Sequence, residues 1–229
     1  MTGLQRSMNV VLAAQNILSK TGWLSEQPAD FQERTKAIAR WRKFRAGENL
    51  YEAGDAPDAV FGLEDGFLDV TIPISKDEMV NIWRAQPGFW IGDSALLADK
   101  PRGISIMARV DCMVLVIPGP ALRRHLLEMP QDFAYFYKLS YSNLVLTLQV
   151  LSEVLAMSPR SRFARLLLRF ASKEGVVRMT QTELGALSGM SRAAFRRAFS
   201  DLIKDGVVKT EYGVLRILDR GSLEKAAHF

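Results

Sequence analysis

The sequence has few of the residues that build metal centres and hydrolytic active sites. Its 229 residues include one cysteine, Cys112, and two histidines, His125 and His228. A single cysteine excludes an intramolecular disulfide, and zinc and iron–sulfur centres need several Cys or His ligands. The sequence also lacks a Ser/His/Asp or Cys/His set and a Walker-type phosphate loop. We therefore expect neither an enzyme nor a metal centre, and we expect Cys112, in "DCMVLVI", to be buried.

Long apolar runs and targeting signals are missing as well. No uninterrupted apolar segment reaches the ~18 residues of a membrane span. The N-terminus lacks the basic, apolar and small-residue order of a secretory signal. Hydrophobic residues make up 48% of the chain and charged residues 24%, which is typical of folded domains. These features predict a cytoplasmic protein of one large or two small domains, with no membrane partner.

Positive charge is concentrated at one end of the chain. Residues 158–229 contain 14 Lys and Arg against 7 Asp and Glu, whereas residues 1–157 contain 16 against 18. A basic C-terminal third on a nearly neutral body favours a polyanionic partner for that third. A basic surface that only keeps the protein soluble would give the same balance.

The first part of the chain reads as helices followed by short strands. Residues 1–40 have a polar, helical pattern. The stretch "DFQERTKAIARWRKF" has apolar positions at Phe31, Ile38, Trp41 and Phe44. From residue 41 to 118, short runs of Val, Ile, Phe and Leu alternate with turn signals such as "AGEN", "AGDAPD" and "LEDG". This alternation predicts an antiparallel sandwich or barrel, and "PGPALRRHLLEMP" predicts a short helix after it.

Residues 131–157 contain almost no helix breaker and predict one long helix. Its apolar residues repeat at spacings of 4, 3, 4, 3 and 4, at Tyr137, Tyr141, Leu144, Leu148, Leu151 and Leu155. A seam with a period of 3.5 residues is the pattern of two helices that pack along each other. We expect this helix to pair with a second copy of the chain; burial against its own domain is the alternative.

The basic region, residues 158–229, begins with a helix and a strand. Ser158 can cap a helix in "SPRSRFARLLLRFASKEG", with a proline at its first position and Gly175 closing it. "VVRM" then predicts a short strand. A capping box of Thr180 and Glu183 opens the next, brief helix.

The remainder of this region completes a recognisable motif. Gly189 ends the brief helix, and Ser191 caps "RAAFRRAFSDLIKDG", which stops at Gly206. "VVKTEYGVLRIL" predicts two strands joined by a turn around Tyr212–Gly213. The order helix, strand, short helix, tight turn, helix and hairpin is that of a winged helix-turn-helix.

Particular residues of "GMSRAAFRRAF" suit a helix that lies against DNA. Gly185 supplies the small residue needed where the two helices cross, and Gly189 can take the positive φ of the turn. The apolar positions expected to face inward are Leu184, Met190, Phe195 and Phe199. The outer side then carries Arg192 and Arg196, with Arg197 adjacent. Arginine can grip phosphate or read a guanine edge bidentately, and the hydroxyl and amides at the helix start favour a phosphate nearby.

Over residues 20–225 the chain resembles the family of the cyclic-AMP receptor protein and the fumarate–nitrate regulator (CRP/FNR). "FRAGENLYEAGD" is similar to the family's opening strands, with turns at Gly47 and Gly54, and "VFGLEDGFLDV" to its next hairpin. The resemblance implies an α+β chain in three parts. They are a cyclic-nucleotide-binding-type β-roll (a double-stranded β-helix, jelly-roll-like) in residues 1–130, a dimerisation helix in residues 131–157, and a DNA-binding winged helix-turn-helix in residues 158–229.

"GMSRAAFRR" is similar to the start of the family's recognition helix, where a serine and two arginines five apart contact DNA. The candidate DNA-contacting residues are Thr182, Ser191, Arg192, Arg196, Arg197 and Lys209. Ala193 stands where the family usually has an acidic residue, so a carboxylate that could accept from cytosine is gone. The implied partners are double-stranded DNA with an inverted-repeat operator, a second copy of the chain, and RNA polymerase as a further candidate.

The effector cassette of the family is matched less well. Its counterparts in "FWIGDSALLADKPRGIS" and the long helix are Gly92, Asp93, Ser94, Arg102, Gly103 and Thr147. In the family a glutamate binds the ribose and an arginine followed by a hydroxyl residue holds the cyclic phosphate; here Asp93 is one methylene shorter and Gly103 lacks the hydroxyl. We expect weak or absent cyclic-AMP binding, with a cyclic nucleotide or another small ligand as the effector. An exposed loop position is the alternative for Arg102.

Two other readings stay open at this point. In the haem branch of the family a single His or Cys could be an axial ligand, although His125, in the amphipathic "LRRHLLE", is expected at the surface. The chain could also be a cyclic-nucleotide-type sensor that acts on a protein partner without binding DNA. The turn glycines and the arginines of "GMSRAAFRR" favour DNA binding.

Overall fold

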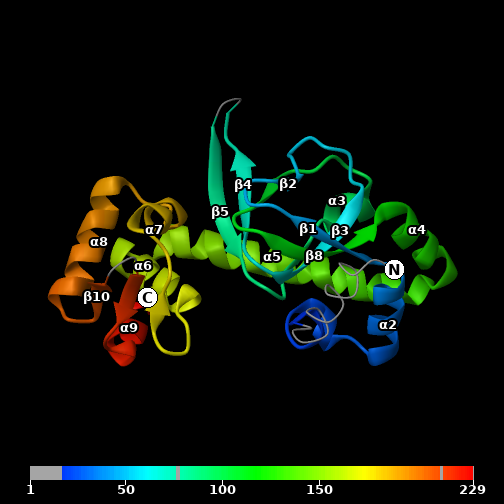
Figure 1. Ribbon diagram of the computed structural model, residues 1–229. Helices are drawn as coiled ribbons and strands as arrows, with labels where there is room; N and C mark the ends of the chain where they lie inside the picture. Colours follow the sequence, from blue (N-terminus) through cyan, green and yellow to red (C-terminus); the bar gives the residue numbers. More distant parts are fainter. Residues whose placement is uncertain (1–16, 76–77, 212–213, 229) are drawn as a thin grey trace. The chain divides into compact units, whose positions relative to one another are not determined.

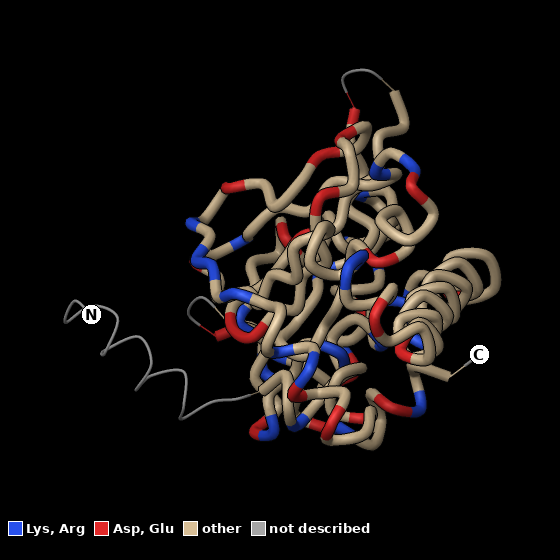
Figure 2. The backbone as a smooth tube through the Cα atoms, turned by 90° about the vertical axis from the view of Figure 1, so that its right-hand side faces the viewer, with Lys and Arg blue, Asp and Glu red and all other residues tan. Residues whose placement is uncertain are grey.

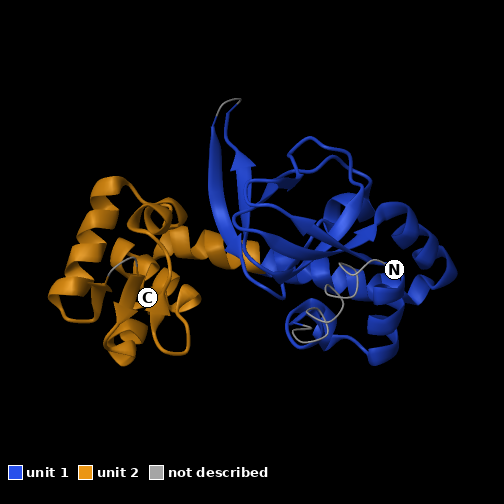
Figure 3. Cartoon of the chain, viewed as in Figure 1, with its two compact units in different colours: residues 1–145 blue, residues 146–229 orange. Residues whose placement is uncertain are grey.

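The computed structural model describes residues 17–75, 78–211 and 214–228 (Figure 1). It divides into two compact units, residues up to Val145 and residues from Leu146 onward (Figure 3). The first contains the two four-stranded antiparallel sheets and the second the basic region. Each unit has its own hydrophobic core.

The first unit starts with short helices: η1 (Ile17–Ser19), η2 (Trp23–Glu26) and α2 (Ala29–Ala37). The change from helix to strand predicted at residue 41 is confirmed, because α2 ends at Ala37 and β1 (Arg40–Phe44) is a strand. It pairs antiparallel with β8 (Cys112–Pro118), with Trp41 opposite Leu115. The predicted helical pattern before residue 17 lies outside the described residues.

Two four-stranded antiparallel sheets form the body of the β-roll, in the orders β1-β8-β3-β6 and β2-β7-β4-β5. The further strands are β2 (Asn49–Tyr51), β3 (Ala59–Asp65), β4 (Leu68–Pro73), β5 (Met79–Ala85), β6 (Trp90–Ile91) and β7 (Ser105–Ala108). One core cluster joins side chains of both sheets, among them Phe61, Leu63 and Val114 with Leu68, Val70 and Ile106. The predicted β-roll is confirmed, and Cys112 is buried in this core as expected.

The segment "VFGLEDGFLDV" is not a hairpin, contrary to the prediction. Its first strand, β3, pairs with β8 and β6, whereas β4 pairs with β5 and β7. The turn between them therefore crosses from one sheet to the other. Gly66 makes the crossing with φ of 97°, and a Cβ there would lie 2.5 Å from the Cys112 Sγ. Only glycine fits this backbone conformation and this close approach.

Helices cover the outer face of the β1-β8-β3-β6 sheet. They include α4 (Gly119–Glu128), η3 (Pro130–Asp132) and the first half of α5 (Phe133–Ala156), while α3 (Asp93–Ala98) follows β6. A second core cluster packs Trp23, Phe31 and Phe136 against Val60 and Leu115 of the sheet. The predicted long helix is confirmed as α5, which begins two residues later and ends one residue earlier than expected.

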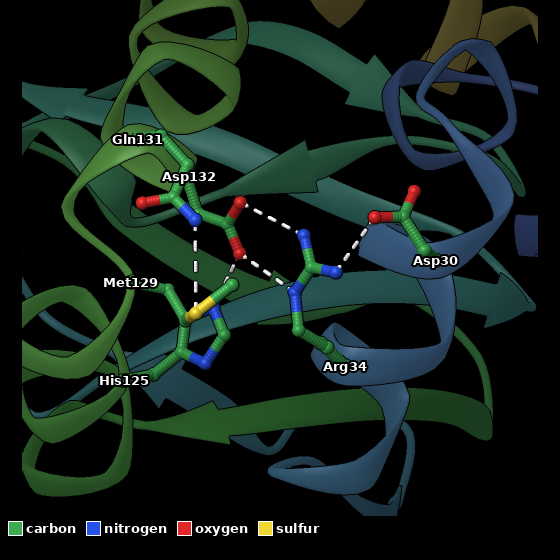
Figure 4. Close-up of polar contacts among 6 residues, drawn as sticks. All are labelled: Asp30, Arg34, His125, Met129, Gln131 and Asp132. Atoms are coloured by element: carbon green, nitrogen blue, oxygen red, sulfur yellow. Dashed lines mark hydrogen bonds and ion pairs between the residues drawn. The ribbon is translucent and has the colours of Figure 1, made fainter.

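His125 is buried, contrary to the prediction that it lies at the surface. Its Nε2 is 2.8 Å from the Asp132 Oδ2, and Asp132 also accepts from the Arg34 Nε at 3.0 Å and Nη2 at 2.9 Å (Figure 4). Burial would raise the pKa of Asp132, but the hydrogen bonds from Arg34 and His125 hold it below its usual value. The cluster ties α2 to the junction of α4 and α5. It also engages the imidazole nitrogen that a haem would need.

The second unit contains the end of α5 and the winged helix-turn-helix. Its elements are α6 (Pro159–Phe170), β9 (Val176–Val177), α7 (Gln181–Leu187), α8 (Arg192–Lys204), β10 (Val208–Glu211), β11 (Val214–Ile217) and α9 (Arg220–Ala226). The three strands form one sheet in the order β10-β11-β9. The first helix ends at Phe170, before the predicted stop at Gly175, and α9 was not predicted. The turn expected at residues 212–213 lies outside the described residues.

Candidate DNA interface and effector site

A core of aromatic and aliphatic side chains holds α6, α7 and α8 together. The Phe163 ring of α6 is 5.2 Å from Phe195 and 5.8 Å from Phe199, both on α8. Leu184 of α7 is fully buried in the same cluster, and Met190 packs against it. The four positions expected to face inward therefore do so, which leaves the opposite side of α8 to the solvent.

Local hydrogen bonds cap the N-termini of α7 and α8. The Glu183 backbone N donates to the Thr180 Oγ1 at 3.2 Å, and the Thr180 backbone N donates to the Glu183 Oε2 at 3.0 Å, which is the predicted capping box. Between the helices, Gly189 has φ of 60°, in the left-handed region. The Ser191 Oγ accepts from the Ala194 backbone N at 3.3 Å, so the predicted cap is confirmed. The hydroxyl proton of Ser191 remains to donate to a phosphate.

The contact between α7 and α8 at Gly185 does not require glycine. A Cβ built on Gly185 would lie 3.7 Å from the Phe195 ring, which is ordinary van der Waals contact. The prediction asked only for a small residue here, and the structure leaves room for alanine.

Three arginines of α8 are exposed and have no ion-pair partner among the described residues. They are Arg192, Arg196 and Arg197. Basic and acidic residues are intermixed along most of the chain (Figure 2). Five other arginines of the second unit form ion pairs: Arg160 with Asp205, Arg165 and Arg169 with Glu153, Arg216 with Glu211, and Arg220 with Glu224. The charge on α8 is thus left for a partner outside the chain.

A surface hollow of about 550 Å³ lies between α7 and α8. Polar side chains of both helices line it: Gln181, Thr182, Arg192 and Arg196. Gly185, Ala186, Met190 and Phe195 supply its apolar lining. The structure thus brings Thr182 together with two of the three arginines, while Arg197 lies outside the hollow. Sequence reasoning missed Gln181, although its place directly after the Thr180 cap marks it as exposed.

The wing places Lys209 beside an acid. Its Nζ is 2.9 Å from the Glu211 Oε1, and Arg216 donates to the same carboxylate at 3.1 Å. The hydrogen bonds from Lys209 and Arg216 lower the pKa of Glu211, so this carboxylate is charged at neutral pH. Lys209 must loosen its contact with Glu211 to bind a phosphate, unlike the arginines of α8.

Asp93 of the effector cassette is buried and bonded to α5. Its Oδ2 accepts from the Ser140 Oγ and, at 3.3 Å, from the Ser94 Oγ, and its Oδ1 accepts from the Asn143 Nδ2 at 3.4 Å. Burial raises the pKa of Asp93, and the hydrogen bonds from Ser140 and Ser94 oppose that shift. Gly92, with φ of 99°, turns the chain into α3 just before it. Sequence reasoning missed Ser140 and Asn143.

Arg102 is buried, so the alternative of an exposed loop arginine is wrong. Its Nη1 donates to the Gly92 backbone O at 2.7 Å, and its Nη2 donates to the Ala59 O at 2.6 Å and the Asp58 Oδ1 at 3.2 Å. The guanidinium carbon lies 4.2 Å from the centre of the Tyr51 ring. Hydrogen bonds within the protein and ring stacking therefore occupy most of the charged group.

The remaining cassette positions add little to a cyclic-nucleotide site. Gly103 is exposed, and a Cβ there would meet nothing within 4 Å. Thr147 is exposed on α5, seven residues after Ser140. A cyclic nucleotide needs a carboxylate for its ribose and a cation for its phosphate, but Asp93 and Arg102 are both engaged inside the protein. In this conformation the residues present do not fit the ligand.

Comparisons with known proteins agree with this two-part architecture. A model of the cyclic nucleotide-binding domain matches residues 41–128, and a model of the Crp-like helix-turn-helix domain matches residues 161–226. The transcriptional regulatory protein btr of Bordetella pertussis is 26% identical over 208 residues, which is 86% of either chain.

Two solved structures share the fold. FixK2 from Bradyrhizobium japonicum is 16% identical and has a TM-score of 0.72 over 84% of this chain and 98% of its own. The c-di-GMP responsive regulator CLP of Xanthomonas campestris is 18% identical, with a TM-score of 0.68 over 83% and 99%. These two structures show the shared fold, and the two domain matches, one in the β-roll and one in the basic region, lead to one assignment. The chain belongs to the CRP/FNR family of transcription regulators, which bind DNA and are not enzymes.

Proposed function

We propose that two copies of this chain pair through residues 131–157 and bind an inverted-repeat operator in double-stranded DNA. Residues 158–229 are the DNA-binding part and residues 1–130 the effector-sensing part. The observation that carries the proposal is the outer face of α8, where Arg192, Arg196 and Arg197 are exposed without ion-pair partners in the described chain. Unpaired guanidinium groups beside a capped helix start suit phosphates and guanine edges.

The apolar seam of α5 supports pairing between copies. Its six residues are about half to three-quarters exposed in the single chain: Tyr137, Tyr141, Leu144, Leu148, Leu151 and Leu155. An apolar stripe of this length marks an interaction surface, and its period of 3.5 residues suits a second helix. A second copy offers the same stripe, so a two-fold axis along α5 covers both at once.

The same helix is apolar enough to be tested against a membrane. By length and composition, Pro130–Ala156 is the one described helix that could cross a bilayer, with a mean hydropathy of 1.2. Phe136 and Leu139 of this helix, however, are buried in the core of the first unit, which packs its N-terminal half against the β-roll. We propose helix pairing rather than insertion, and a cytoplasmic location with RNA polymerase as a further partner.

Within this proposal Ser191, Arg192, Arg196 and Arg197 lie in the major groove, and Thr182 contacts the flanking backbone. Arg192 stands at the start of α8, where residues of a recognition helix reach base edges. Lys209 on the wing contacts a phosphate. Selection of binding sites from random duplexes with the purified protein tests the proposal, and an inverted repeat is the expected product. Failure to enrich any site would favour a sensor that acts on a protein partner instead.

The effector of the β-roll is a separate part of the proposal. Because Asp93 and Arg102 are held by Ser140 and by backbone carbonyls, we expect cyclic AMP to bind weakly or not at all. Titration calorimetry with cyclic AMP and cyclic GMP measures this directly. Binding at micromolar concentration or tighter would show that both side chains are released to the ligand, and the effector would then be a cyclic nucleotide.

A further inference from the structure

The start of α8 offers a narrow set of base-reading side chains. Residues 191–197 read S-R-A-A-F-R-R and include no Asp, Glu, Asn or Gln. In the major groove a carboxylate accepts from cytosine N4, an amide pairs bidentately with adenine, and a guanidinium pairs with guanine. Residues 191–197 therefore lack the side chains that bind cytosine and adenine in these ways. They contain three arginines, which can bind guanine.

Ala193 lies at the centre of the outward face. On a helix of 3.6 residues per turn it is about 200° around the axis from Phe195, and Phe195 is buried in the core. The Ala193 methyl group is exposed, whereas the Ala194 side chain beside it is partly buried. Arg196 and Arg197 follow three and four positions later, so they flank this methyl group on the same side of the helix.

A methyl group at that position has one natural partner in the groove. Thymine is the base that presents a methyl group there, and alanine is among the side chains that contact it. Three or four residues advance a helix by about 5–6 Å, which is one to two base-pair steps of about 3.4 Å. A thymine under Ala193 would therefore lie within about two base pairs of a guanine under an arginine.

We propose that Ala193 is a specificity-determining residue that contacts the methyl group of a thymine close to an arginine-bound guanine in each half-site. This inference rests on the proposed placement of α8 in the major groove. It adds that the half-site pairs thymine with guanine at short spacing, and that a cytosine at the thymine position is disfavoured because residues 191–197 offer no carboxylate to accept its amino hydrogens.

The test starts from the operator that site selection yields with the wild-type protein. Each thymine is replaced in turn by uracil, which lacks only the methyl group, and binding is measured by fluorescence anisotropy. Loss of one buried methyl contact should weaken binding about fourfold, and this penalty should appear at one thymine in each half-site. Ala193→Gly should bind the thymine and uracil duplexes equally.

Two further variants separate this contact from helix stability. Ala194→Gly also weakens the same turn of the helix but leaves the Ala193 methyl group in place, so it should keep the uracil penalty. Ala193→Glu supplies a carboxylate, and repeated selection should replace the thymine with cytosine.

The possible results point in different directions. An operator without a thymine near the guanine, or a uracil penalty that persists in Ala193→Gly, would overturn the inference while leaving DNA binding intact. Failure to select any operator would overturn the proposed function as well, so the two failures are distinguishable.

Discussion

Arginine has opposite roles in the two units of the molecule. In the β-roll, Arg84 pairs with Asp69 at 2.6 Å and Arg102 donates to two backbone carbonyls, and both are buried. On α8, Arg192 and Arg196 are exposed and have no ion-pair partner in the described chain. A buried guanidinium whose amino groups are bound by its own protein holds its own fold together. An exposed one without a partner is available to a phosphate or a base.

The difference in burial shows that a family motif alone does not identify a ligand-binding arginine. The cassette arginine and the recognition-helix arginines were both assigned to ligands from their place in a motif. Their surroundings separate them, because Arg102 sits on the Tyr51 ring with Gly92 and Ala59 as acceptors. The contrast predicts that changes at Arg102 alter folding, whereas changes of the exposed arginines of α8 alter only DNA binding.

The largest expected effect is on the stability of the β-roll. Arg102→Met leaves the Gly92 and Ala59 carbonyls without their donors, at a cost of about 1–3 kcal/mol for each. Chemical denaturation followed by circular dichroism should show a clear loss in the free energy of unfolding. Arg123→Met is the control, because Arg123 is half exposed and pairs with the exposed Asp99; it should change stability by less than about 1 kcal/mol. Equal effects of the two variants would contradict the structural role of Arg102.

The next effect is on assembly. Leu148→Glu places a charge in the proposed seam of α5, where it costs several kcal/mol unless the helices separate. Sedimentation should show monomers, and DNA binding should fall with them because a dimer binds two half-sites. Gln149→Glu adds the same charge one residue away, outside the seam, and should remain dimeric. A Leu148→Glu protein that stays dimeric and binds DNA would place the interface elsewhere.

The sequence predicts a contact well when the two residues are close in the chain, and poorly when they are far apart in it. The Thr180–Glu183 box and the Ser191 cap join residues three apart, so their pattern is visible in the chain. Asp93 and Ser140 are 47 residues apart, and Arg34 and Asp132 are 98 apart. No local sequence pattern indicates such pairs. For this reason the burial of His125 and the hydrogen bond between Asp93 and Ser140 were not predicted.

Strand pairing set a second limit. The sequence "VFGLEDGFLDV" alternates apolar residues around a glycine as a hairpin does, yet its strands belong to different sheets. Short β-strands show which residues face a core but not which strand they pair with.

A moderate effect is expected at the start of α8. Arg192→Ala should cost about 1–3 kcal/mol in DNA binding and relax the base preference at one symmetric pair of positions. The free energy of unfolding should not change, because Arg192 makes no ion pair in the described chain. Site selection with the variant and the wild type measures the preference. Full retention of the preference would show that Arg192 contacts only the backbone of the DNA.

The smallest effect is expected on the wing, where charge is already compensated. Lys209→Ala should weaken binding about equally for all DNA sequences and reduce the salt slope by about 1, the signature of one phosphate contact. Glu211 competes for Lys209 and also holds Arg216, so Glu211→Gln should free both cations and strengthen binding, most clearly at low salt. Affinity measured against salt concentration for the wild type and both variants tests this. If Lys209→Ala instead changed the selected sequence, the wing rather than α8 would be reading bases, and the contrast between paired and unpaired cations would not identify the DNA-reading surface.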